Sequence, residues 1–346
     1  MPDLLQQGIN LVERGLVPDS MTRFAIRRLC AQHLQTPEHF GKLPATSKFL
    51  ESLTSEQIAL SPEKANEQHY ELPAAFFELV LGPRRKYSCC LFDSPQSTLE
   101  EAEIRALQET CSHAELSDGQ SILELGCGWG SLSLWMAESY PSSQILALSN
   151  STPQRLYIEQ QIKARSLSNL RIITADINKF VTDEQFDRVV SVEMFEHLRN
   201  FELVLRKIAG WLKPSGQLFV HHFCHRTLAY PFEVEGSANW MGRYFFTGGI
   251  MPSADLLSTF NRDLVVTNRW DWSGTHYQRT SEAWLVKLDQ NRAQAMEILK
   301  TAYGPREAER WFHRWRMFFL AVAELFGFSA GKEWFVTHQL LRHAAS

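Results

Sequence analysis

The chain has 346 residues, of which 44% are hydrophobic and 21% are charged, so it can bury a large core as one domain or as a domain with a helical cap. The formal net charge of −4 argues against an extended phosphate-binding surface, and nucleic acid is not expected as a partner, although Arg84, Arg85 and Lys86 form a local basic patch. Six cysteines without a CxxC pair or regular spacing indicate neither a zinc ribbon nor a disulfide framework, and they fit a reducing, cytoplasmic location.

No stretch of the sequence approaches the roughly 18 uncharged apolar residues that a membrane span needs, and the N-terminal segment lacks the apolar core of a signal peptide. A soluble protein is therefore expected. Transient contact with a membrane surface and assembly as a homodimer both stay compatible with the sequence.

Residues 1–110 carry apolar residues at helical spacing, for example over 21–34 and 74–81, and predict a helical N-terminal cap. From Ser121 onward, short apolar runs alternate with amphipathic helical patterns, which predicts βαβ units and a mostly parallel sheet. The expected strands are SILELG, QILALS, LRIITAD, FDRVVSVE and QLFVHHF, and the expected helices lie near 131–140, 153–166 and 200–212.

The pattern loosens around the fifth expected strand. LKPSGQL, just before it, is typical of a turn in which Pro stops the helix and Gly reverses the chain. The expected second domain spans 111–346 and contains an aromatic and glycine-rich insertion at residues 226–260. After the insertion, the predicted elements are a strand at LVVTNRWDW, helices over 281–299 and 305–326, and a last strand at EWFVTHQLLR.

ELGCGWG, residues 124–130, follows the strand SILEL and opens a helix, where a glycine loop can bring its backbone against a ligand. A plain strand-to-helix turn is the alternative. No Asp or Glu occurs over 141–158, where a nicotinamide dinucleotide site would place its ribose-binding acid. The amides of Asn150 and Gln154 could instead meet ribose hydroxyls. Asp176 could accept an adenine amino group with Ile177 against the ring, or it could cap the next helix.

Several long segments resemble one family. They are ANEQHYELPAAFFELVLG, KYSCCLF, VEMFEHLRNFE, VHHFCHRTLAYPFE, RYFFTGGIMPSADLL, WRMFFLAVAELFG and KEWFVTH. Together they resemble the class I S-adenosylmethionine-dependent methyltransferases and, among these, coclaurine N-methyltransferase and its relatives, which are similar to the cyclopropane fatty acid synthases. The resemblance runs from about residue 62 to the C-terminus. It implies an α/β, Rossmann-like seven-stranded sheet with a helical N-terminal cap and a helical C-terminal lid over 281–326.

The resemblance also implies S-adenosyl-L-methionine as cofactor and a set of residues that hold it. Tyr87 and Ser88 would reach its methionine end, Gly126 and Gly128 would line it, Ser149, Asn150 and Gln154 would hold the ribose, and Asp176 and Ile177 would hold the adenine.

VEMFEH, residues 192–197, places two carboxylates and an imidazole at the carboxyl edge of the fourth expected strand, where ligands gather in such sheets. An amine acceptor is mostly protonated near pH 7, so a carboxylate can bind the ammonium while a neighbouring base removes its proton. By resemblance, Glu196 and His197 are the expected proton acceptors, and Glu193 is expected to position the amine or the sulfonium. The structural alternative is that Glu193 and Glu196 only complement the positive end of a helix dipole at a helix N-terminus.

A metal site is not expected. Strand alternation puts His221 and His225 on one face of the fifth strand and His222 and Cys224 on the other, so the four cannot converge. His221 is interpreted as a pocket residue.

The residues expected in the substrate pocket are Cys89, His221, Phe223, Tyr244 and Phe328. Aromatic residues of the insertion and of 311–318 could form a cation-attracting wall, or could be plain core. In the cyclopropane synthases a bicarbonate site uses residues that match Cys89, Glu196 and His221, but also a C-terminal tyrosine, and this chain has no Tyr after Tyr303. The sequence therefore favours methyl transfer to the nitrogen of a small aromatic amine over transfer to a lipid alkene or a catalytically silent module.

Overall fold

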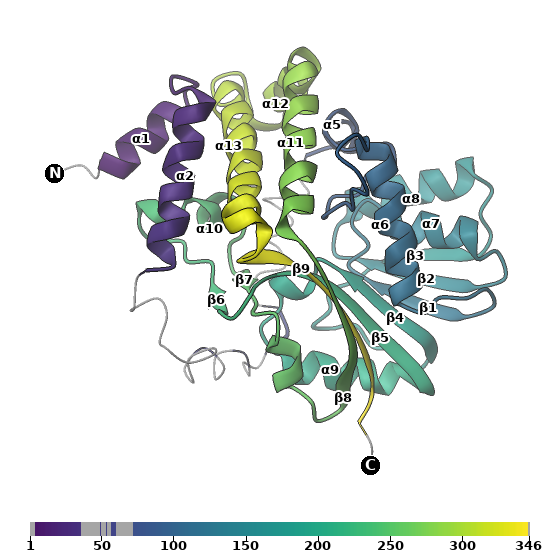
Figure 1. The fold of residues 1–346 in the computed structure, drawn as a ribbon. Helices are drawn as coiled ribbons and strands as arrows, with labels where there is room; N and C mark the ends of the chain where they lie inside the picture. The colour runs from purple at the N-terminus through teal and green to yellow at the C-terminus, as the bar shows by residue number, and fades with distance from the viewer. Residues whose placement is uncertain (1–3, 36–48, 50–52, 54–56, 60–71, 345–346) are drawn as a thin grey trace.

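The computed structural model of the chain describes residues 4–35, 49, 53, 57–59 and 72–344. In this part of the chain a seven-stranded sheet has the order β3-β2-β1-β4-β5-β9-β8 (Figure 1). The first five of these strands are parallel, and β9 and β8 extend the sheet in antiparallel pairing. The strands are β1 (Ser121–Leu125), β2 (Gln144–Ser149), β3 (Leu170–Thr174), β4 (Phe186–Val192), β5 (Leu212–His225), β8 (Leu264–Trp272) and β9 (Trp334–His343). The predicted α/β class and sheet are confirmed.

Side-chain alternation along the strands divides the core into two layers. On β1, Ile122 belongs to the cluster that contains side chains of α6 (Leu99–His113), α7 (Ser131–Ser139) and α8 (Thr152–Ala164). Its neighbours Leu123 and Leu125 belong to the cluster on the other face, which is covered by α9 (Phe201–Trp211). Helices therefore cover both faces, as the near-continuous apolar character of the parallel strands requires.

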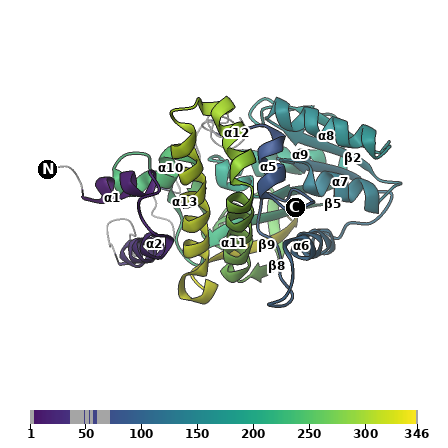
Figure 2. The same cartoon turned by 90° about the horizontal axis from the view of Figure 1, so that it is seen from above.

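The remaining helices stand beyond one end of the sheet. In Figures 1 and 2, α11 and α13 lie side by side, with α2 on the outer side of α13. These helices are α1 (Leu4–Val12), α2 (Asp19–His33), α5 (Ala74–Val80), α11 (Gly274–Gln290), α12 (Arg292–Tyr303) and α13 (Ala308–Gly327). None of the helices in the described ranges is both long and apolar enough to span a bilayer.

Short elements complete the insertion and the connections. They are β6 (Tyr230–Pro231), β7 (Ile250–Met251), α10 (Trp240–Tyr244), η1 (Phe195–His197), η2 (Ser237–Asn239), η3 (Leu256–Thr259) and η4 (Phe328–Gly331). The expected domain boundary at residue 110 falls inside α6, three residues before that helix ends. Residues 65–71, the first part of the motif ANEQHYELPAAFFELVLG, lie outside the described residues.

Two local predictions are wrong. The single helix expected over 281–299 is two helices, α11 and α12, because Asn291 interrupts it and donates its side-chain amide to the carbonyls of Leu79 and Lys287. LKPSGQL does not form a separate turn before the strand. The register between β4 and β5 instead jumps at residues 213–216, which form a bulge within β5.

A buried ion pair fastens the N-terminal segment to α13. Arg314 donates through Nε and Nη2 to the two carboxylate oxygens of Glu13, at 3.1 Å each. The indole of Trp240 donates to the same carboxylate at 2.9 Å, and Tyr244 accepts from Arg314 at 3.2 Å. Glu13 and Arg314 are 5% and 8% exposed, so removing one partner would leave the other charge buried without its counter-ion.

We expect Glu13→Ala to lower the free energy of unfolding by about 3–5 kcal/mol, the cost of stranding a buried charge. Urea unfolding followed by circular dichroism measures this. Glu297→Ala is the matched control, because Glu297 pairs with Lys300 on the exposed face of α12, where an ion pair contributes about 0–1 kcal/mol. Equal losses in the two variants would show that the buried pair does not fasten the segment.

Candidate active site

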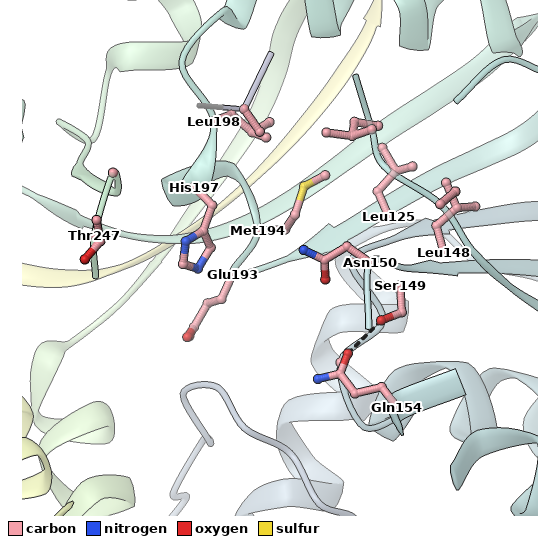
Figure 3. Close-up of a pocket in the computed structure, with 16 residues that line it drawn as sticks. Leu125, Leu148, Ser149, Asn150, Gln154, Glu193, Met194, His197, Leu198 and Thr247 are labelled. Atoms are coloured by element: carbon pink, nitrogen blue, oxygen red, sulfur yellow. Dashed lines mark hydrogen bonds between the residues drawn. The ribbon is translucent and has the colours of Figure 1, made fainter. Parts of the chain in front are cut away.

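A cavity open to solvent lies at the carboxyl ends of β1, β2 and β4, and its space, including the solvent at its mouth, is about 860 Å³ (Figure 3). Its wall residues are Ala59, Leu125, Gly126, Gly128, Leu148, Ser149, Asn150, Gln154, Ala175, Ile177, Glu193, Met194, His197, Leu198, Thr247 and Gly248. A second cavity of about 580 Å³ shares Gly126, Gly128 and Glu193 with the first and reaches Tyr87 and Ser88. This edge of a parallel sheet is where ligands bind in open α/β folds.

The glycine loop is held against β2 and turned toward the cavity. The backbone N–H groups of Gly126 and Cys127 donate to the carbonyl of Leu148 at 3.0 and 2.9 Å. Gly126 has φ +75°, and a Cβ there would lie 2.8 Å from the side chain of Met194, whereas a Cβ on Gly128 would meet nothing within 4 Å. Gly128 therefore presents open backbone to the cavity, which is the cradle that a close ligand needs.

The carboxylate of Glu124 connects the start of the glycine loop to α7. It accepts a hydrogen bond from the hydroxyl of Ser133, at the start of α7. Burial raises the pKa of Glu124 to about 7, and the Ser133 hydrogen bond lowers it in part. Glu124 also contributes to the wall of the second cavity.

A polar edge follows β2. Ser149 donates its hydroxyl to Gln154 Oε1 at 2.7 Å (Figure 3), which leaves Gln154 Nε2 buried and without a hydrogen-bond partner among the described residues. An unpaired buried amide is costly unless a ligand accepts from it. The donor set of this edge therefore fits a ligand with hydroxyl groups.

Asp176 and Ile177 take different positions. Ile177 lines the larger cavity, but Asp176 is outside its wall and uses Oδ1 to accept from the backbone N–H of Asn178 at 2.9 Å. This contact stabilises a local turn, and no helix follows it, so the helix cap that the sequence left open as the alternative is not formed.

Glu193 is the carboxylate that both cavities share. Its Oε1 accepts the backbone N–H of Cys89 at 2.9 Å and lies 3.1 Å from His221 Nε2. Its Oε2 accepts the hydroxyl of Tyr277 at 2.6 Å. Burial raises the pKa of Glu193, while the charge of Lys86 and the Tyr277 hydrogen bond oppose that rise.

The backbone of Glu193 is in the left-handed region, at φ +47°. A non-glycine residue there is strained, and such strain persists only where the surroundings impose it. The N–H of Glu193 donates to the carbonyl of His221 at 2.8 Å, which holds the turn at the end of β4.

His197 lies beside Glu193 on the cavity wall, and Figure 3 shows both side chains projecting from the same loop. Its ring stacks on Phe246, with centroids 5.3 Å apart. Burial lowers the pKa of His197 to about 4, against the opposing charge of Glu193. The imidazole is therefore neutral near pH 7, with a lone pair on its unprotonated ring nitrogen.

Glu196 lies behind the wall and lines neither cavity. Its side chain is fully buried, and Oε1 accepts the backbone N–H of Phe223 at 2.7 Å, whereas Oε2 has no partner among the described residues. Burial and the nearby charge of Glu193 raise the pKa of Glu196 well above its usual value.

Of the residues expected in the substrate pocket, some lie next to Glu193 and Glu196 and others lie away from the cavities. Cys89, His221 and Phe223 lie directly behind Glu193 and Glu196, through the contacts given above. Tyr244 and Phe328 line neither cavity. Tyr244 packs on Arg314 of α13, and Phe328 packs on Trp334.

Lys86, Tyr277 and Thr247 belong to the site but were not expected there. Lys86 was interpreted as part of a basic patch, yet it is buried and donates Nζ to Ser88 Oγ and to the Cys89 carbonyl, at 2.6 Å each. Tyr277 lies on α11, far from Glu193 in sequence, and no local pattern marks it. Within the described ranges, no three His, Cys, Asp or Glu side chains are placed to hold a metal ion.

Comparisons with known proteins show the family to which the chain belongs. Residues 59–329 match the family model described as mycolic acid cyclopropane synthetase. The chain is 38% identical over 346 residues to (S)-coclaurine N-methyltransferase of Thalictrum flavum subsp. glaucum, covering 98% of this chain and 96% of the relative. It is 36% identical over 337 residues to the enzyme of the same name from Papaver somniferum, covering 96% of each chain.

A crystal structure of coclaurine N-methyltransferase bound to N-methylheliamine and SAH matches the fold with a TM-score of 0.92. The sequence identity is 37%, and the match covers 97% of this chain and 99% of that one. The mixed sheet, with a glycine loop after β1 and a cavity at the carboxyl edge of its parallel strands, is a Rossmann-like methyltransferase fold like that of this relative. The chain belongs to the mycolic acid cyclopropane synthetase family, as a homologue of the coclaurine N-methyltransferases.

We expect Glu196→Gln to stabilise the protein at neutral and alkaline pH. A buried carboxyl with a raised folded-state pKa keeps its proton when folded, so ionisation of the unfolded chain lowers wild-type stability from about pH 5 upward, by ~1.4 kcal/mol per pH unit until the folded-state pKa is reached. The amide does not ionise and avoids this loss.

Urea unfolding of Glu196→Gln and wild type over a pH series measures the difference. Glu297→Gln, on the exposed face of α12, is the control and should track wild type. A difference between Glu196→Gln and wild type that stays constant with pH would show that Glu196 is ionised in the folded protein.

Proposed function

We propose that the protein transfers a methyl group from S-adenosyl-L-methionine to the nitrogen of a small aromatic amine of the benzylisoquinoline or aralkyl class. The observation that carries the proposal is the pair Glu193 and His197, which share a cavity wall beside an open glycine loop. The names of the N-methyltransferase relatives support the same acceptor class.

The polar and apolar groups that line the larger cavity and the adjoining cavity fit the cofactor. Gly128 offers open backbone, Ser149 and Gln154 offer a buried hydroxyl and amide, and Ile177 offers an apolar wall for a ring. Tyr87 and Ser88, in the adjoining cavity, are placed for the opposite end of the molecule. When bound, S-adenosyl-L-methionine supplies an electrophilic methyl group on a sulfonium.

The wall residues have two tasks toward the amine. The buried carboxylate of Glu193 attracts an ammonium ion and holds it in a low-dielectric site, which orients the nitrogen for in-line attack. Neutral His197 accepts the proton that must leave before the lone pair is free. The aromatic ring of Phe246, stacked on His197, covers this pair against water.

This division of labour differs from the expectation that Glu196 and His197 form the proton-accepting pair. Glu196 has no place on the cavity wall and holds the backbone N–H of Phe223 instead. We assign it to supporting the loop that carries Glu193 and His197. Met194 of the same loop closes against Gly126.

We also propose that α2, α11 and α13 act as one cover over the site. Arg23 of α2 forms ion pairs with Glu282 of α11 and Glu324 of α13. Arg316 of α13 forms an ion pair with Asp19 of α2.

All six cysteines are free thiols, which supports the proposal of a reducing, cytoplasmic location.

Incubation with methyl-labelled S-adenosyl-L-methionine tests the acceptor class. Benzylisoquinoline and phenethyl amines form one arm, and vesicles of unsaturated phospholipid form the other. We expect label in N-methyl amine, identified by mass spectrometry. Label in the lipid alone would replace the amine proposal by the lipid chemistry that the family name suggests.

We expect His197→Gln to reduce kcat for amine methylation by about 100-fold to 10,000-fold, the range for loss of a general base. Cofactor affinity, measured by calorimetry, should change little. The control His225→Gln removes a buried imidazole that lies off the cavity wall and accepts the backbone N–H groups of Thr227 and Leu228, and it should keep wild-type turnover. Wild-type turnover in His197→Gln would remove His197 from the mechanism.

A further inference from the structure

Three histidines connect Glu193 to the surface in an unbroken row. His221 on β5 lies 3.1 Å from Glu193 Oε1 through Nε2. Its Nδ1 lies 2.8 Å from Nε2 of His338 on β9. His338 Nδ1 lies 2.8 Å from Nδ1 of His113 at the end of α6, and His113 Nε2 lies 3.1 Å from Glu109 Oε2.

The row passes from full burial to solvent. The side chain of His221 and all of His338 are 0% exposed, whereas the side chains of His113 and Glu109 are 13% and 21% exposed. Glu193, at the inner end, lines both cavities. The row therefore has one end in the proposed active site and the other at the surface.

Aromatic side chains seal the row from water along its length. Trp270 stacks on His113 with ring centroids 4.1 Å apart. Trp272 contacts both His221 and His338, at 5.5 and 4.2 Å, and Phe219 packs on His338 at 5.0 Å. Within these walls the imidazoles provide the hydrogen-bonded path.

Counting hydrogens shows that the row can hold a mobile proton. Its four links need four hydrogens, but three neutral imidazoles supply three N–H groups and two carboxylates supply none. A fully bonded row therefore carries one added proton. Shifting each hydrogen across its own link moves that proton from Glu193 to Glu109 and leaves all three imidazoles neutral.

Packing of the core alone does not explain why three histidines are buried in a row. Burying polar rings between β5, β9 and α6 costs free energy that apolar side chains of similar size would not cost. Burial lowers the pKa of His221 and His338 well below the usual value, so neither ring stores a proton. The resting places for a proton are the two ends.

We propose that Glu193, His221, His338 and His113 form a proton relay that carries the proton released by methyl transfer from the active site to Glu109 and solvent. The inference rests on the proposed function. In that reaction the N–C bond forms, the C–S bond breaks with its electron pair going to sulfur, and the amine gives up one proton. His197 accepts that proton and transfers it to the Glu193 carboxylate on the same cavity wall, and Glu193 passes it outward through the row.

Other charged and titratable groups face the row and set its proton affinity. Lys86, Cys89, His197 and Tyr277 act on the Glu193 end. His222 and Lys86 act on His221 and His338. Arg105 acts on the His113 end, where it opposes Glu109. A pH profile of the relay therefore reports these groups as a set.

Two variants interrupt the row without touching the cavity. His338→Gln keeps two hydrogen-bonding ends but cannot take up and pass a proton, and His113→Ala opens the row at its surface end. We expect each variant to lower kcat about 10-fold to 100-fold and to leave the KM for the amine unchanged. The upper limit of about 100-fold is the smallest effect that loss of a general base itself usually has. Added imidazole should restore turnover in His113→Ala, because the missing ring lies at the exposed end.

The control is His225→Gln, which removes a buried imidazole from the same strand that accepts the backbone N–H groups of Thr227 and Leu228 and lies outside the row. Its kcat should match wild type and should not respond to imidazole. Relay variants that match this control would overturn the proposal. A loss in His113→Ala that imidazole does not restore would also overturn it, because that outcome assigns the ring to packing.

A second measurement does not depend on turnover. In the substrate-free protein, nitrogen NMR of the imidazoles should show that Glu193→Gln shifts the titration of His113, although the two side chains are separated by two rings. An unchanged His113 titration would overturn the relay even if the wild type methylates amines. If the wild type makes no N-methyl product, the proposed function fails, and this titration still decides whether the row is coupled.

Discussion

The buried carboxylate of Glu193 is the interaction on which the site depends. It joins three separate parts of the chain, through the backbone of Cys89, the hydroxyl of Tyr277 and the ring of His221. A carboxylate taken out of water has to be satisfied by such partners. Because these partners come from the segment before α6, from α11 and from β5, the charge can be buried only when the whole fold is assembled.

The sheet order then determines what the carboxylate faces. With β1 and β4 adjacent, the turn after β4 lies next to the glycine loop after β1, and Met194 closes against Gly126. The antiparallel addition of β9 beside β5 brings His338 next to His221. One topology therefore brings together the glycine loop, the Glu193 carboxylate and the inner end of the histidine row.

Much of the fold was predictable from local patterns. The five parallel strands, the glycine loop and the helices between them follow from apolar runs of strand length separated by amphipathic stretches. The break at Asn291 was missed because its amide is satisfied by Leu79, which is distant in sequence. The bulge at 213–216 was missed because Pro and Gly favour a turn equally well, and only pairing with β4 distinguishes the two.

The sequence by itself determined the fold class, the ligand edge and the cluster Glu193, Glu196 and His197, because these depend on short-range spacing and recognisable motifs. Only the tertiary structure decided that Glu193 and His197 face the cavity while Glu196 lies behind it, since a 3₁₀ turn directs neighbouring side chains differently. It also decided that Tyr277 and the three histidines of the row join the site. Those contacts cross long stretches of chain, and burial of charge acts on distance in space rather than in sequence.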